Sequence, residues 1–242
     1  METNMRNKKN HRYSYVNHDS RGSKFINKNF NKTESYHSNF SNASFENTAF
    51  IGAKLKFCSL YAAVFDSCYI RGTLFRNCNL ESSIFRNSII SATVFENCNL
   101  KRCKFENCKI ISSTKFERLL PNECFVDTEI FQTYLDRTNF TPTLILKVEE
   151  LRSNDFIRKS SVLHRKEKKI DTIALKVLVD IFGEDFLIEH LEELPKMITK
   201  EFYTLSYLAH FLHKIRKYDK KKIPGPAALG APKLTNDCSS TD

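Results

Sequence analysis

A five-residue period constrains this chain more than any other feature of its sequence. From Phe25 to Phe140 every fifth residue is large and apolar, except Ser35 and Lys115, and a small residue lies two positions earlier in most units. Neither the 3.6-residue period of a helix nor the two-residue period of a strand explains a spacing of five. The pattern therefore predicts a chain that turns a corner every five residues.

The repeat resembles that of the pentapeptide-repeat proteins, most closely in "ASFENTAF", "CNLESSIFRN" and "CNLKRCKFENC". The resemblance covers residues 25–140, about half of the chain, and implies a right-handed quadrilateral β-helix with four pentapeptides per turn. Residues twenty apart would then stack at one strand spacing, about 4.8 Å. The sequence agrees, because residue type is kept along each face: Phe25, Phe45, Phe65, Phe85 and Phe105 on one, and Phe30, Phe50, Ile70, Ile90 and Ile110 on the next.

The chain divides into the coil, at residues 25–141, and three further segments. We expect a flexible basic N-terminal arm at residues 1–24, an α-helical module at 142–222 and a disordered tail at 223–242. The repeat loses register at Lys115 and Pro121 follows, which predicts a distorted coil or projecting loop at about 111–124. The expected fold class is a mainly β solenoid followed by a small α-helical bundle.

The helical module is predicted from apolar spacing. Apolar residues from Ile170 to Phe182 recur at helical intervals, and Gly183 supplies a stop. A shorter helix is expected over 184–194 and a weaker one over 146–160. A third helix is expected to begin at Pro195, with these residues on one face: Ile198, Phe202, Leu205, Leu208, Leu212 and Ile215. Such a module could cap the end of the coil, dimerise it or hold a partner.

Composition and targeting signals favour a soluble, cytoplasmic protein. No apolar run reaches the ~18 to 20 residues of a membrane span, and no apolar core follows the basic residues near the N-terminus. If the protein is a secreted effector, its place would be the host cytosol. Lys and Arg number 38 against 28 Asp and Glu, a net charge of +10.

Cysteines and histidines give no positive support for catalysis. Six of the eight cysteines occupy the small inward site of the repeat, where they are expected to be free buried thiols, although Cys78 and Cys98 could stack within bridging distance. His210 and His213 have the spacing for a metal pair on a helix, but no Cys or carboxylate accompanies them there, which favours a packing or surface role. No catalytic residue, cofactor or metal site is predicted.

An apolar band is predicted on the outside of the coil. The position before each large residue should point outward, and in the middle turns it is apolar: Val64, Tyr69, Leu74, Ile84, Ile89 and Val94. Stacking by twenty places these residues in pairs on three faces. They are candidates for binding a partner, since monomers rarely expose a large apolar patch without using it. The alternative is that such ladders only stabilise the stacked strands.

The basic charge leaves a second class of function open. Its densest cluster, Lys217, Lys220, Lys221 and Lys222, could contact nucleic acid or an acidic membrane surface, or could simply be a solvated helix end. Family members that protect DNA gyrase present an acidic rod, and this coil has the opposite charge. The preferred hypothesis is therefore a non-catalytic protein–protein interaction scaffold, as an effector or adaptor. The alternative is a topoisomerase- or nucleic-acid-interacting protein, and an enzyme in the helical module ranks last. The expected partner is a protein, with a homodimer through the helical module as a further option.

Overall fold

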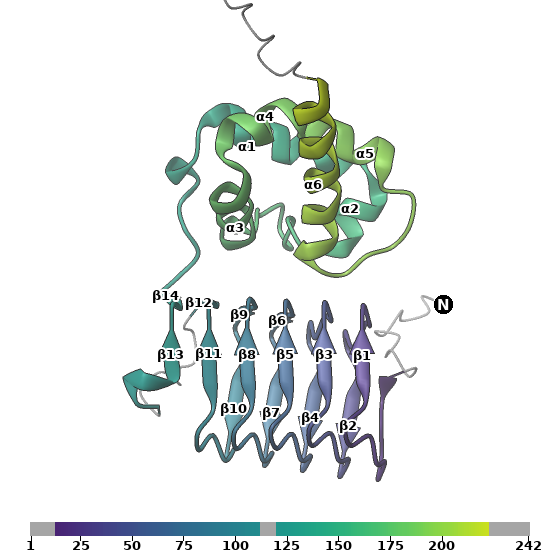
Figure 1. The fold of residues 1–242 in the computed structure, drawn as a ribbon, viewed down its shortest axis with the longest axis vertical. Helices are drawn as coiled ribbons and strands as arrows, with labels where there is room; N and C mark the ends of the chain where they lie inside the picture. The colour runs from purple at the N-terminus through teal and green to yellow at the C-terminus, as the bar shows by residue number, and fades with distance from the viewer. Residues whose placement is uncertain (1–12, 112–119, 223–242) are drawn as a thin grey trace, which may run out of the picture.

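The computed structural model of the protein describes residues 13–111 and 120–222, and the side chains among these up to residue 219. Two parts are visible, a β-solenoid and a group of helices beside it (Figure 1). The predicted tail, residues 1–12 of the predicted arm and most of the predicted loop lie outside the described residues.

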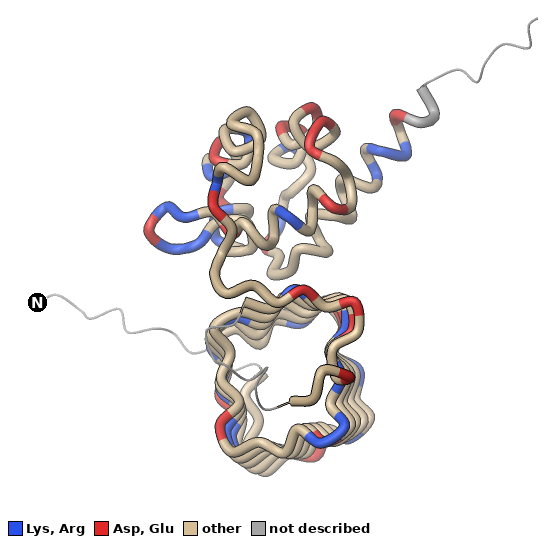
Figure 2. Tube along the Cα trace, turned by 90° about the vertical axis from the view of Figure 1, so that its left-hand side faces the viewer, with Lys and Arg blue, Asp and Glu red and all other residues tan. Residues whose placement is uncertain are grey.

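Three parallel sheets form three faces of the solenoid. The first contains β1 (Lys24–Ile26), β3 (Ser44–Glu46), β5 (Val64–Asp66), β8 (Ile84–Arg86), β11 (Lys104–Glu106) and β13 (Phe125–Val126). The second contains β2 (Glu34–Tyr36), β4 (Lys54–Lys56), β7 (Leu74–Arg76) and β10 (Val94–Glu96), and the third β6 (Tyr69–Arg71), β9 (Ile89–Ser91), β12 (Lys109–Ile111) and β14 (Glu129–Phe131). The fourth face is held by isolated bridges, such as Asn79 to Asn99. Viewed along its axis, the coil has a square outline (Figure 2).

The register confirms the predicted repeat of twenty residues per turn. Phe65 pairs with Phe85 and Phe85 with Phe105, and their rings stack with centroids 4.5 and 4.9 Å apart. These rings are fully buried, as the inward assignment required. Stacked aromatic rings and aliphatic side chains thus fill the interior of the coil.

Each pentapeptide turns its corner with one residue in the left-handed region. Every corner residue from Asn17 to Asn107, two places after a large inward position, has a φ between 47° and 67°. Asn and Gly tolerate this conformation better than most residues, which explains why Asn recurs there. These left-handed residues produce the corner that the repeat predicts every five residues.

The coil begins earlier and ends earlier than predicted. Val16 and Asp19 already bridge to the second turn, and Tyr13 and Tyr15 pack on the ring of Phe30, so residues 13–24 belong to the coil and close its first turn. At the other end β14 is the last strand, and Phe140 lies in the core of the helices. The five-residue spacing continues in the sequence as far as Phe140 because an apolar residue can be buried in the core of the coil or in the core of the helices.

Six α-helices follow the coil within the described residues: α1 (Pro142–Glu150), α2 (Asp155–Ser160), α3 (Thr172–Phe182), α4 (Glu184–His190), α5 (Leu194–Met197) and α6 (Leu205–Lys222). The helices predicted over 170–182 and 184–194 are confirmed, although α4 ends at His190 and a 3-10 turn follows. The weaker helix over 146–160 is interrupted, because Asn154 caps a new helix by accepting a hydrogen bond from the Ile157 amide.

The single helix predicted from Pro195 is wrong. The chain leaves the helix at Ile198, which is extended with φ −93° and ψ 102°, and α6 starts only after Thr204. The segment between contains β-branched and aromatic residues, which lose side-chain freedom in a helix. All six apolar residues assigned to the shared face are nevertheless buried, so spacing identified the core but not the backbone that carries it.

The helices pack against the flank of the coil rather than its end, which corrects the expectation of an end cap (Figures 1 and 2). They cover the third sheet, and the coil residues Tyr69, Ile89 and Ile111 belong to the helical core. Among the described residues, no helix combines the length and apolar composition needed to cross a membrane.

Candidate interaction surfaces

The six residues of the predicted apolar band stack in pairs, as the sequence indicated. Val64 pairs with Ile84 on the first sheet, Leu74 with Val94 on the second, and Tyr69 with Ile89 on the third. The structure therefore places them on three neighbouring faces, while Asn79 and Asn99 lie on the fourth.

Only four of the six reach solvent. Val94 is 42% exposed and Val64, Leu74 and Ile84 are half-buried, whereas Tyr69 and Ile89 are only 1% and 5% exposed. The prediction that Tyr69 and Ile89 form part of an exposed band is wrong. Their apolar surface is already covered, because the helical module packs on it.

A buried polar contact fixes this packing. The Tyr69 hydroxyl donates to Oδ2 of Asp171 at 2.6 Å, and Oδ1 of the same carboxylate accepts from the Ala174 amide at 3.0 Å, which caps α3. The guanidinium of Arg71 lies 3.6 Å from Oδ2. Burial raises the pKa of Asp171, and burial followed by the charge of Asp171 raises the pKa of Tyr69. The contact therefore joins a coil face to the N-cap residue of a helix, and both the hydroxyl and the carboxylate have hydrogen-bond partners.

A cavity of about 320 Å³ lies between the coil and the helices. It is lined on the coil side by Asn87, Asn107 and Ile89, and on the helix side by Val177 and Ile181. A second cavity of about 560 Å³ adjoins Tyr203, Tyr207 and His210 on the helix side and Asn27 and Asn47 on the coil side.

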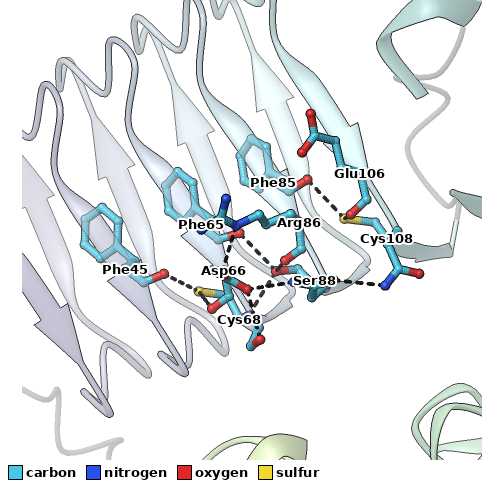
Figure 3. Close-up of polar contacts among 12 residues, drawn as sticks. Phe45, Phe65, Asp66, Cys68, Phe85, Arg86, Ser88, Glu106 and Cys108 are labelled. Atoms are coloured by element: carbon cyan, nitrogen blue, oxygen red, sulfur yellow. Dashed lines mark hydrogen bonds and ion pairs between the residues drawn. The ribbon is translucent and has the colours of Figure 1, made fainter. Parts of the chain in front are cut away.

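The coil wall of the first cavity is held by contacts between successive turns (Figure 3). The Asn107 amide donates to Oδ1 of Asn87 at 2.9 Å, and the Cys68 thiol donates to the carbonyl of Phe45 at 3.3 Å. Burial raises the pKa of that thiol well above its ordinary value, so it stays protonated and is a poor nucleophile. The polar groups of this wall hold turns together.

Six cysteines occupy the small inward site as predicted, and Cys124 lies in a 3-10 turn outside it. Cys58, Cys78, Cys103 and Cys108 are buried, and all seven cysteines of the described residues are free thiols. Burial raises the pKa of Cys108 to about 12. Cys238 lies outside the described part of the chain.

The two histidines on α6 lie on the surface of the helical module. His213 contacts the ring of Phe182 with centroids 4.7 Å apart, and His210 lines the second cavity. Across residues 13–111 and 120–222, no three His, Cys, Asp or Glu side chains come together in a way that could hold a metal ion.

The predicted basic cluster is only partly described. Lys217 is exposed on α6, whereas the side chains of Lys220, Lys221 and Lys222 lie outside the described residues. A second basic element escaped the sequence reasoning, although the run "HRKEKK" could have revealed it. This turn, residues 164–169, closes with a bridge between His164 and Ile170, and Arg152 donates to the carbonyl of Lys168 at 2.9 Å.

Comparison with known proteins gives one family. Residues 38–116 match the model of a pentapeptide repeat region. A pentapeptide repeat protein from the cyanobacterium Cyanothece is 16% identical, with 39% of this chain and 89% of that chain covered and a TM-score of 0.20. One from the Arabidopsis thaliana thylakoid lumen is 18% identical, with 43% and 72% covered and a TM-score of 0.22.

QnrB1, a plasmid-mediated fluoroquinolone resistance protein, is also similar in structure. It is 18% identical, with 40% of this chain and 52% of that chain covered and a TM-score of 0.20. No curated protein matches the sequence.

Proposed function

Because the coil of this protein belongs to the pentapeptide-repeat family, we propose that the chain is a non-catalytic interaction scaffold whose uncovered coil faces bind a partner protein. One observation carries the proposal. The Tyr69 and Ile89 ladder binds a protein surface within the same chain, and the equivalent ladders on the two neighbouring faces still reach solvent. Apolar residues in the same structural position are thus suited to the same kind of contact.

The charges of the coil support a protein partner over a nucleic acid. Five of its cations pair with carboxylates about one turn away: Lys54 with Glu34, Arg76 with Glu96, Arg86 with Asp66, Arg102 with Glu81 and Lys109 with Glu129. A surface that grips duplex phosphates needs unpaired cations along its length. The topoisomerase or nucleic-acid role is therefore the weaker proposal.

The helical module is less suited to dimerisation than the coil. Its apolar residues form one core that also contains Tyr69, Ile89 and Ile111 of the coil. Because the apolar side chains of the helices are already buried in this core, we place the contact surface on the coil.

Capture from cell lysates by the purified protein tests the proposal. We expect wild type to retain a partner and the double variant Ile84→Lys with Val94→Lys to lose it while remaining folded, because a contact core does not accept unpaired charge. The matched control, Asn79→Lys with Asn99→Lys, adds the same charge to the fourth face and should retain the partner. Equal capture by both variants would refute this surface. An adaptor and an effector differ in the cell that supplies the partner, so lysates of bacterial and eukaryotic cells separate these roles.

A further inference from the structure

Among the described corners of the coil, one carries a large apolar residue, which the corner geometry disfavours. Phe57 has a φ of 54°, in the left-handed region, where the next two turns of the same column have Asn77 and Asn97. A bulky residue in this region is an outlier, and such outliers gather at functional sites. Folding of the coil alone would favour Asn or Gly at this position.

The ring of Phe57 is also exposed, which removes a packing explanation. It is 48% exposed and stacks on the exposed imidazole of His37 one turn earlier, with centroids 5.0 Å apart and planes 10° apart. The pair lies between the second sheet and the fourth face, and the helices cover the third sheet instead (Figure 2). The stack is therefore open to a partner.

A cation lies directly beside this stack. The ammonium of Lys56 is 3.0 Å from the Tyr36 hydroxyl and 5.1 Å from the centre of the Tyr36 ring, and no carboxylate of the described residues lies within ion-pair distance. Tyr61, on the same turn, is exposed as well. The corner thus combines rigid aromatic rings with an unpaired positive charge, which are features of interface anchors.

We propose that Phe57, His37 and Lys56 form an anchor site for a partner-protein segment that carries an aromatic or aliphatic side chain next to acidic residues. This inference rests on the proposed function and names the chemistry of the partner. Phe57 supplies apolar contact area, and Lys56 selects for negative charge.

The charges around this site argue against a nucleic-acid occupant. Lys54 pairs with Glu34 and Arg76 pairs with Glu96, so among the described residues the strands of the second sheet offer Lys56 as a single free cation rather than the row of cations that a phosphate backbone requires.

Selection from a displayed library of random peptides on the intact protein tests the site. Phe57→Asn is the matched variant, because Asn occupies the same corner one turn later and should keep the coil folded. We expect the enriched peptides to carry an apolar residue flanked by Asp or Glu and to bind Phe57→Asn at least about tenfold more weakly than wild type. Lys56→Gln should weaken binding several-fold and Lys56→Arg should restore it, whereas Lys101→Gln on the far side of the fourth face should leave it unchanged.

Three outcomes of the selection and of direct binding measurements would overturn this inference. They are a selection without Phe57-dependent binders, one that enriches basic peptides, and binding of a single-stranded oligonucleotide that Phe57→Asn abolishes. The proposed function is tested separately, by capture from cell lysates. If lysate capture depends on Ile84 and Val94 but is unchanged in Phe57→Asn, the scaffold role stands and the anchor site is refuted.

Discussion

Tyr69 donates a hydrogen bond of 2.6 Å to Asp171, a residue 102 positions later in the chain. The donor points outward from a coil face, and the acceptor caps the first turn of α3. Because both groups are almost fully buried, each would lose its hydrogen bond to water without replacement if the other were absent. This contact makes the coil and the helices one structural unit.

Removing the Tyr69 hydroxyl should loosen the helical module. Tyr69→Phe leaves Oδ2 of Asp171 buried without its closest donor, and we expect a loss of about 1–3 kcal/mol in the free energy of unfolding, measured by urea denaturation. Tyr61→Phe removes an exposed hydroxyl and should stay within about 0.5 kcal/mol of wild type. Similar midpoints for the two variants would show that the contact does not hold the module in place.

The buried carboxyl group of Asp171 should make stability depend on pH. Burial raises its pKa above the ordinary value, so its folded form binds the proton more tightly than the unfolded chain does. The contribution of Asp171 is then fully present below the ordinary Asp pKa, near 3.9, and is lost as pH rises through the folded pKa.

Asp171→Asn isolates that contribution, because the amide can still accept from Ala174 and cannot ionise. The stability of Asp171→Asn relative to wild type should therefore improve as pH rises from about 4 towards neutrality, compared by urea midpoints. A difference that stays constant over this interval, or that changes in favour of wild type, would contradict the raised pKa.

The stacked interior should be far more sensitive than the outer surface. Phe85 is fully buried between the rings of Phe65 and Phe105, so Phe85→Ala should cost about 3–5 kcal/mol. Arg86 is the next residue and pairs with Asp66 in a half-exposed ion pair, so Arg86→Ala should cost at most about 1 kcal/mol. Comparable urea midpoints would overturn the inward and outward assignment.

The sequence predicts the coil well because its information is local and repeated. One residue type at one position in five determines the inward side, and twenty-residue stacking then places Phe65 beside Phe85 without further assumptions. The left-handed corners follow equally from the recurrence of Asn.

The covered face could not be predicted in the same way. Tyr69 occupies the same position in its pentapeptide as Val64 and Leu74, so the repeat assigns it the same exposure. Tyr69 is buried because the helical module packs on it and Asp171 accepts its hydrogen bond. No local sequence pattern encodes these distant contacts. The break at Ile198 was missed because the helical spacing of the apolar residues continues across it, although the β-branched and aromatic residues of 198–204 disfavour a helix.

Thiol labelling at two matched outward positions tests the central claim, that the helices close one coil face and leave its neighbour free for a partner. Ile89→Cys and Val94→Cys lie one pentapeptide apart on adjacent faces, and wild type gives the background from native cysteines. We predict that maleimide modifies Val94→Cys at least about tenfold faster than Ile89→Cys, since labelling of a covered site requires local opening. We also predict that a captured partner slows the labelling of Val94→Cys and leaves the labelling rate of Ile89→Cys unchanged. Equal labelling rates at the two positions, or a rate at Val94→Cys that the bound partner leaves unchanged, would contradict the account.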